Sequence, residues 1–397
     1  MKRSASSSTE PAFYLLLAFL FLIDVSIAAC YILGTIILVL FLFHLRRGGK
    51  FPPLPTYNYF FAAYIGFTLL ATVFSVDRAA SIRDNKELLI FLLVPLYLWL
   101  LDSWKRVRLS LVAVLASGVF SALAGLFTIW RKGIVLSDRL TGFTSHWMTY
   151  SGLLMFPFIF FSVLLVLRHE KKKEAATVGL SLALMLAAIA FSLTRNVWLG
   201  IAVALSLFLA FFRPRYLLVL APLALALALL APPAVRSRVL SIVDLQDRSN
   251  RDRIYMAWSG LRIFQDRPWT GVGSHNIEKV ILGNEARYRH PQAEQVNLHL
   301  HNNFLQILAE RGIFALASFV LACLFIILQV LARWKAQEGE WRAVTAAVLF
   351  AFVGFLVAGL FEYNFGDSEI KFILFYFLTL PFLQLQGDAH AQTQPHR

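Results

Sequence analysis

The chain has 397 residues, of which 58% are hydrophobic and only 15% charged, and its mean hydropathy is +0.66. This composition excludes a soluble globular domain, and repeated apolar runs near the length of a bilayer crossing predict an all-α polytopic membrane protein. The net charge of +14 does not indicate a nucleic-acid partner, because much of the basic charge in membrane proteins sets topology. Cys30 and Cys323 lie in or beside apolar runs, so we expect neither a disulfide framework nor a cysteine metal site.

About twelve transmembrane helices are predicted. The first apolar stretch, Pro11 to Phe43, is too long for one span and carries Asp24, so we expect two short retained helices that turn near Cys30. The later spans are expected at Tyr57–Val76, Leu88–Leu101, Leu109–Trp130, Met148–Leu167, Val178–Leu193, Trp198–Phe212, Tyr216–Leu230, Ile313–Leu331, Val344–Phe361 and Phe372–Leu385.

The distribution of basic residues predicts the orientation and the domains. The short loops of one side hold 18 Lys and Arg residues and those of the other side hold 8, which places both termini in the cytoplasm. Residues 1–230 would then form transmembrane helices 1–9, and residues 231–312 one large, partly helical periplasmic loop. Residues 313–397 would form helices 10–12 and a cytoplasmic tail.

The long loop contains predicted structure of its own. Arg251 to Gln265 has the apolar spacing of an amphipathic helix, and the segment up to Pro268 should end it. Gly271-Val-Gly273 predicts a tight turn, after which Ser274 is the expected cap of a second short helix that ends near Leu282.

The outer side is more basic than topology requires, because the long loop adds 11 Lys and Arg residues. Guanidinium groups bind phosphate in a bidentate manner, so this excess predicts a site for a diphosphate or an anionic head group. Solvated loop charge and ordinary contacts with membrane lipids are the alternative. Arg195 is the most specific candidate, because the short hairpin Ser192–Trp198 would hold it at the mouth of the bundle, although it could instead snorkel to the interface.

Another outer segment offers Arg139, small residues including Gly142, and His146 at the start of a span. Three outer loops with Arg or His at span ends favour one convergent site.

His301 is the candidate catalytic base. If Asn302 to Glu310 is helical, His301 shares a stripe with Phe304, Leu305 and Leu308 and points inward. The alternative is a packed histidine that is hydrogen-bonded to a backbone carbonyl.

His290, His299 and His301 could contribute ligands to a metal site, but no carboxylate lies at a familiar ligand spacing, so we expect no metal. Serine-nucleophile and Walker patterns are absent, and we expect no cofactor. The energy for a reaction would therefore have to come with the substrate.

Short motifs in the chain resemble a known family. His301-Asn302, followed by nine residues and Gly312, resembles the signature of the bacterial O-antigen ligases, which belong to a superfamily of O-antigen ligases and polymerases; Ala315 departs from the last signature position. Arg253-x4-Trp258 before Pro268-x-x-Gly271-x-Gly273, and Arg139-x-x-Gly142 with His146, also resemble that superfamily.

The resemblance implies a metal-independent, inverting glycosyltransferase of lipopolysaccharide biosynthesis in the bacterial inner membrane. It would move a glycan from undecaprenyl diphosphate to a sugar hydroxyl of lipid A–core at the periplasmic face. His301 would be the base, and Arg195 and Arg253 would hold the diphosphate, although Arg236-Ser-Arg-Val-Leu240 offers a second arginine motif. The weaker substrate-binding candidates are Arg139, His146, Arg78, Arg83, Lys86, Asn302 and Arg267.

Two other functions are the alternatives. An O-antigen polymerase or a protein O-oligosaccharyltransferase of the same superfamily would differ only in its acceptor. A lipid or glycan transporter would carry out no chemistry, but the spans hold almost no charge beyond Asp24, whereas ion-coupled transporters usually carry intramembrane charges. The sequence does not define the glycan, the acceptor sugar or the oligomeric state.

Overall fold

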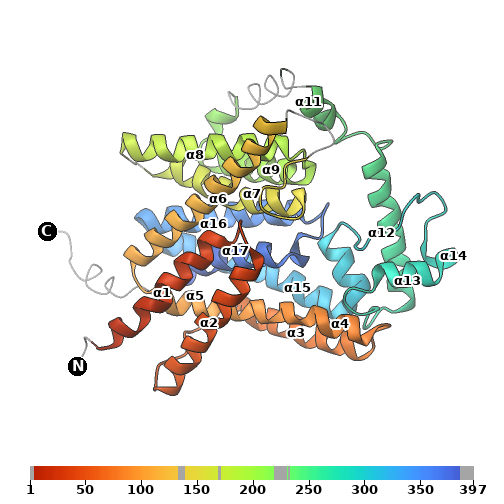
Figure 1. The fold of residues 1–397 in the computed structure, drawn as a ribbon, viewed down its shortest axis with the longest axis horizontal. Helices are drawn as coiled ribbons and strands as arrows, with labels where there is room; N and C mark the ends of the chain where they lie inside the picture. The colour runs from red at the N-terminus through yellow and green to blue at the C-terminus, as the bar shows by residue number, and fades with distance from the viewer. Residues whose placement is uncertain (1–3, 133–138, 169–170, 219–229, 231–232, 385–397) are drawn as a thin grey trace.

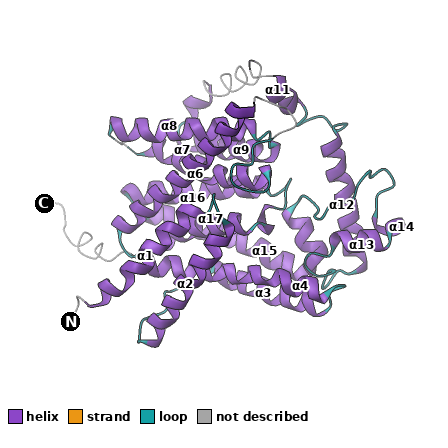
Figure 2. Cartoon of the chain, viewed as in Figure 1, coloured by secondary structure: helices purple, strands orange, loops and turns teal. Residues whose placement is uncertain are grey.

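The computed structural model describes residues 4–132, 139–168, 171–218, 230 and 233–384. These residues form helices and loops and contain no strand (Figure 2). Seven of the helices are long and apolar enough to cross a membrane. The prediction of an all-α, multi-pass membrane protein is therefore confirmed, whereas the expected number of about twelve spans is not.

The first two helices are α1 (Ser4–Leu22) and α2 (Ile27–Arg46). The chain turns between them at residues 23–26 and not near Cys30, which lies inside α2, so that part of the prediction was wrong. The turn occurs earlier because Ser26 caps α2 by accepting a hydrogen bond from the backbone N–H of Ala29. Asp24 is buried in the turn, where it accepts a hydrogen bond from Ser117 at 2.6 Å.

The remaining helices of the bundle follow the predicted spans in outline. The expected span Leu88–Leu101 is two short helices, and the expected span Tyr216–Leu230 lies mostly outside the described residues. The bundle consists of α3 (Tyr57–Val73), α4 (Arg78–Asp84), η1 (Asn85–Leu92), α5 (Leu93–Leu100), α6 (Trp104–Lys132), α7 (Trp147–Leu167), α8 (Lys172–Phe191), α9 (Arg195–Phe212), α15 (Asn303–Ala336), α16 (Gly339–Ala358), η2 (Asn364–Gly366), α17 (Ser368–Thr379) and η3 (Leu380–Phe382).

Helix α16 is at the centre of this packing, against α7 and α9. Gly200 of α9 and Gly354 of α16 face each other so closely that a Cβ on Gly200 would lie 2.7 Å from the Gly354 carbonyl oxygen. Small residues at such crossings let helix backbones approach closely in a membrane. This packing fixes the end of α16, which leads into the candidate site.

A helical cap covers one end of the bundle. It contains α11 (Pro233–Leu240), α12 (Arg248–Asp266), α13 (Ile277–Gly283) and α14 (Glu285–Tyr288), and Figure 1 shows α12 running across the direction of the long helices. The predicted amphipathic helix is α12, with Asp247 as its N-cap. The second short helix begins after Asn276 without a side-chain cap, so the expected capping role of Ser274 was wrong.

The cap is joined to the bundle at a kink in α15. Gly312 has φ +78°, which breaks the helix, and the turn from Pro268 to Gly273 inserts at the break. The Ile313 N–H donates to the Pro268 carbonyl at 2.9 Å, and the Gly273 N–H donates to the Glu310 carbonyl at 2.8 Å. A Cβ on Gly312 would lie 2.1 Å from the Trp269 carbonyl oxygen, so only glycine fits there.

Candidate active site

His301 lies just before α15 and not on its apolar stripe, so the predicted helical position of this residue was wrong. Asn302 is the N-cap: its Oδ1 accepts hydrogen bonds from the N–H groups of Phe304 at 2.8 Å and Leu305 at 3.0 Å. An asparagine side chain competes well for these N–H groups, so the helix starts one residue later than the stripe requires. His301 has φ +50°, an uncommon backbone conformation that turns it away from the helix axis.

The start of α15 is bound to the chain that follows α16. The Nδ2 of Asn302 donates to the Leu360 carbonyl at 2.8 Å, and the N–H of Asn303 donates to the Gly359 carbonyl at 2.8 Å. The Asn303 Nδ2 donates to Asn364 Oδ1 at 2.7 Å. These bonds place residues 359–364 beside His301. Both ends of the Asn302 amide are engaged, so its contact with a substrate stays a prediction.

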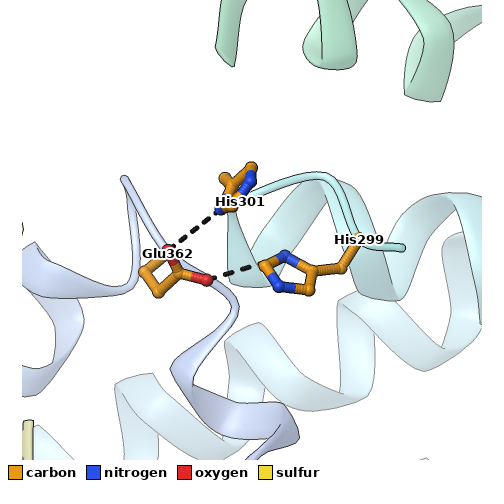
Figure 3. A group of neighbouring side chains, drawn as sticks. All are labelled: His299, His301 and Glu362. Carbon is orange, nitrogen blue, oxygen red and sulfur yellow. Dashed lines mark hydrogen bonds and ion pairs between the residues drawn. The ribbon is translucent and has the colours of Figure 1, made fainter. Parts of the chain in front are cut away.

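Glu362 is the partner of His301 that these bonds bring into place. Its Oε2 lies 3.0 Å from Nδ1 of His301 (Figure 3). A carboxylate only accepts hydrogen bonds, so Nδ1 is the ring nitrogen that donates in this contact. Burial alone would raise the pKa of Glu362, but the hydrogen bond from His301 and the charges of His301, His299 and Arg253 lower this pKa to about 2.

His299 faces the other oxygen of the Glu362 carboxylate. Its Nδ1 is 3.6 Å from Glu362 Oε1, and its ring meets the His301 ring edge to face at 4.3 Å between centroids. Burial is the main cause that lowers the pKa of His299 to about 4, so this ring is neutral near pH 7. His290 is not part of the group, because it stacks on Tyr255 at 4.2 Å.

His299, His301 and Glu362 together form a candidate metal site. Glu362 was not included in the sequence analysis, because it is far from the two histidines along the chain. Ligand atoms of His299, His301 and Glu362 lie within 4.8 Å of one another. Two imidazoles and a carboxylate could hold a divalent cation. The positive charge of Arg253 near the Glu362 carboxylate acts against cation binding at this position.

Arg195 begins α9 in the tight hairpin that the sequence predicted. Its guanidinium group reaches the cap, where Nη1 donates to the Ser241 carbonyl at 2.7 Å and Nη2 donates to Asp247 Oδ1 at 2.9 Å. The side chain is 9% exposed. Because Asp247 also caps α12, this ion pair sets the position of α12 relative to α9.

Arg253 lies on α12 and reaches the loop that carries Glu362. Its Nε donates to the Phe361 carbonyl at 2.9 Å, and its Nη1 donates to Ser249 Oγ at 2.6 Å. Burial lowers the pKa of Arg253, and nearby charges act in both directions: Glu362 opposes the shift and Arg195 adds to it. Arg253 is thus close to both the His301 group and Arg195.

Arg139 and His146 belong to the same region. The Arg139 guanidinium lies over the Trp147 ring at 4.7 Å, and His146 caps α7 and stacks on the same ring at 4.0 Å. Burial lowers the pKa of His146. The charge of Glu362 acts against this shift and the charge of His301 adds to it, both to a smaller extent. Burial and the charge of Arg195 also lower the pKa of Arg139.

Arg238 is a further arginine of this region, and it was not singled out as a site residue in the sequence analysis. Its Nε donates to the Leu193 carbonyl at 3.4 Å. Burial lowers its pKa to about 10, and the charges of Arg139, Arg195 and Arg253 contribute to this shift. Arg238 is the third residue of the motif Arg236–Leu240 noted in the sequence, and Arg236, the first residue of that motif, is exposed.

The guanidinium groups of four arginines lie near enough for their charges to interact with one another and with Asp247: Arg139, Arg195, Arg238 and Arg253. Of these four, Arg253 also interacts with Glu362. Cations held this close, with two positive charges in excess, favour a multiply charged anion between them. The same excess disfavours a bare metal ion.

Four predicted binding residues lie in another part of the cap interface. Arg78 and Arg83 are exposed on α4, Lys86 is exposed on η1, and Arg267 donates to the Phe74 carbonyl at 3.4 Å. Within the described ranges, no hydrogen bond, ion pair or ring contact joins them to His301 or Glu362. Their role in binding stays a prediction.

One weak signal in the sequence could have indicated Glu362. An acidic residue directly follows the predicted span Val344–Phe361, and charged residues next to an apolar span are uncommon enough to suggest a function. Nothing in the spacing of the chain, however, connects that position with His301, 61 residues away.

Comparison with known proteins gives one family. Residues 180–320 match a family model described as O-antigen ligase. The matched range contains Arg195, Arg253 and His301, whereas Arg139 and Glu362 lie outside it. None of the curated proteins compared with the chain matches it.

Proposed function

We propose that this chain, as a member of the O-antigen ligase family, transfers a glycan from undecaprenyl diphosphate to a sugar hydroxyl of lipid A–core. The observation that carries the proposal is that His301 is hydrogen-bonded to the buried carboxylate of Glu362, and that this carboxylate interacts with Arg253, which in turn belongs to a group of four interacting guanidinium groups. The site would face the periplasm, with the reaction contributing to lipopolysaccharide biosynthesis in the bacterial inner membrane.

The arginine cluster suits the donor. As the bond between the glycan and the diphosphate breaks, negative charge grows on the leaving oxygen, and fixed guanidinium groups in a partly dry site stabilise it. Arg195 and Arg253 are the proposed principal contacts, with Arg139 and Arg238 beside them. Nη2 of Arg195 is paired with Asp247, so the donor diphosphate would share this guanidinium group with Asp247 or replace Asp247 as its partner.

The histidine suits the acceptor. The acceptor oxygen attacks the anomeric carbon, the bond to the diphosphate breaks with its electron pair, and Nε2 of His301 takes the hydroxyl proton. Glu362 holds the ring in the tautomer that leaves Nε2 free and stabilises the imidazolium that forms. A single displacement of this kind inverts the anomeric centre and requires no nucleotide.

The test uses the full-length protein in proteoliposomes that contain a lipid-linked glycan and lipid A–core. We expect His301→Ala, Arg195→Ala and Arg253→Ala to abolish transfer or reduce it by about 10² or more. The matched control is His290→Ala, since His290 stacks on Tyr255 outside the group. Full transfer by the His301 variant would rule out the base role.

Two further arms separate the alternatives. A chelator leaves transfer unchanged if no metal acts at His299, His301 and Glu362, and loss of transfer that zinc restores would favour the metal site. Chain growth without attachment to lipid A–core would indicate a polymerase. Passage of intact substrate without a new glycosidic bond would indicate a transporter.

A further inference from the structure

A large groove lies at the end of the bundle opposite to His301. It has a volume of about 820 Å³ and is formed by α6, α7, α8 and α16. Helix α7 starts beside the candidate site at His146 and reaches the groove at its other end, one helix of 21 residues away. At 1.5 Å per residue, about 30 Å separate the groove from the chemistry.

The walls of the groove are apolar and its rim is charged. Leu111, Leu115, Phe161, Leu164 and Val178 are among the residues that form the walls. The rim carries the cations Arg108, Arg168 and Lys171 and the acids Glu174 and Glu340. An elongated molecule with a hydrocarbon part and an anionic group at one end matches this division.

The rim cations are arranged around one carboxylate. Arg108 lies 3.1 Å from Glu340 Oε2, and Arg168 lies 2.5 Å from Glu340 Oε1. The Arg108 side chain is 57% exposed, so its outer face stays accessible. Glu340 thus holds two guanidinium groups next to each other from α6 and α7, while Lys171 adds a third cation at the start of α8.

We propose that this groove binds an anionic phospholipid, with its acyl chains along the apolar walls and its phosphate on Arg108, Arg168 and Lys171. Basic pockets between membrane helices bind such head groups. The short loops at this end carry most of the topological cations of the chain, which matches a leaflet rich in anionic lipid.

The acyl chains cannot by themselves give selectivity. A lipid chain leaving the bilayer for the groove exchanges one apolar surrounding for another, so little free energy is gained. Preference among lipids must then come from the head group and the rim. Lipids with identical chains and different head groups therefore isolate the interaction.

The experiment measures lipid binding to the full-length protein in uncharged detergent micelles by native mass spectrometry. The probes are phosphatidylglycerol and phosphatidylcholine with the same two acyl chains. We expect phosphatidylglycerol to bind about tenfold more tightly, and Arg108→Gln and Lys171→Gln each to reduce that preference about fivefold.

The matched control is Arg46→Gln with Arg47→Gln, which removes two exposed cations at the end of α2, outside the groove. Arg108→Lys, which keeps the charge, should retain most of the preference and shows that a loss in Arg108→Gln is not unfolding. Equal binding of the two lipids to the unmodified protein would overturn the proposal, as would an equal loss in the control. Binding of glycerol phosphate as tight as that of phosphatidylglycerol would also overturn it, since the site would then serve a soluble anion.

Discussion

At the scale of residues, the candidate site depends on one contact across the chain. His301 and Glu362 are 61 residues apart in sequence, yet Nδ1 and Oε2 lie 3.0 Å apart. The carboxylate is buried and its pKa is about 2, so it stays ionised throughout the physiological range. It can therefore hold one tautomer of His301 and balance the charge that proton transfer creates.

Replacing Glu362 by Gln should lower the transfer rate by about 10² or more, because an amide can present its N–H to Nδ1 and favour the wrong tautomer. In the transfer assay kcat should fall while KM for the donor changes little. The matched control is Glu294→Gln, which removes an exposed carboxylate paired with Arg248 on the loop before His301. An unchanged kcat in Glu362→Gln would contradict the positioning role.

His299 should make stability depend on pH. The pKa of His299 is about 4 in the folded protein and lies below the ordinary histidine value of 6.5, so the unfolded chain takes up the proton first as the pH falls. The stabilising contribution is full above about pH 6.5 and is lost between pH 6.5 and 4. We expect His299→Gln to flatten the fall of the melting temperature in that window. Glu362 titrates lower, so a slope that is unchanged in this variant would count against the assignment.

At the scale of elements, the kink in α15 joins two of the three motifs that carry the family resemblance, the one from His301 to Gly312 and the one that ends at Gly273. The Pro268–Gly273 turn hydrogen-bonds to the backbone on both sides of Gly312. The kink fixes the first part of α15 relative to the cap, and His301 stands at the start of that part. The spacing between His301 and Gly312 is thus the length of helix between the candidate base and the kink that fixes it to the cap.

Gly312→Ala should destabilise the protein, because the new Cβ would meet the Trp269 carbonyl at 2.1 Å with the backbone at φ +78°. Strain of this kind costs of order 1–3 kcal/mol or more, and the melting temperature should fall by several degrees. Gly179→Ala in α8 is the matched control, since its Cβ would meet nothing within 4 Å. That change should be neutral or slightly stabilising. Equal melting temperatures for the two variants would contradict the account of the kink.

Elements with a strong local pattern could be predicted from the sequence. The apolar spacing of Arg251 to Gln265 gave α12 within a few residues, and the hairpin before Arg195 occurs as expected. The predicted start of α15 was wrong because the apolar stripe of the helix was extended to His301, which precedes the N-cap Asn302. The kink at Gly312 depends on a tertiary insertion, which no local pattern records.

At the scale of the whole molecule, the arginine cluster comes from four separate segments. Arg139 precedes α7, Arg195 begins α9, Arg238 lies on α11 and Arg253 lies on α12. Bundle and cap must both be in place before these charges meet. The four weaker candidates around α4 and Arg267 lie on a different part of the cap interface.

Inorganic pyrophosphate should inhibit transfer by occupying the cluster. Arg238→Gln should raise the inhibitory concentration about tenfold, the expected cost of one charge-assisted hydrogen bond. Inhibition should also weaken as salt is added, because screening reduces the attraction of the cluster for the anion. Arg262→Gln is the matched control, since Arg262 is exposed on α12 over the Trp258 ring. An equal effect in both variants would show that only the general charge of the cap matters.

The sequence by itself determined the class of this protein, because bilayer crossing requires long apolar helices and leaves a direct record in composition. It also indicated which polar residues between the apolar spans are site candidates, including His301, Arg195 and Arg253, since polar residues are conspicuous there. Only the tertiary structure decided that Glu362 is the partner of His301 and that Arg238 joins the cluster. The physical reason is that these contacts depend on how helices pack, and packing joins positions whose separation along the chain carries no periodic signal.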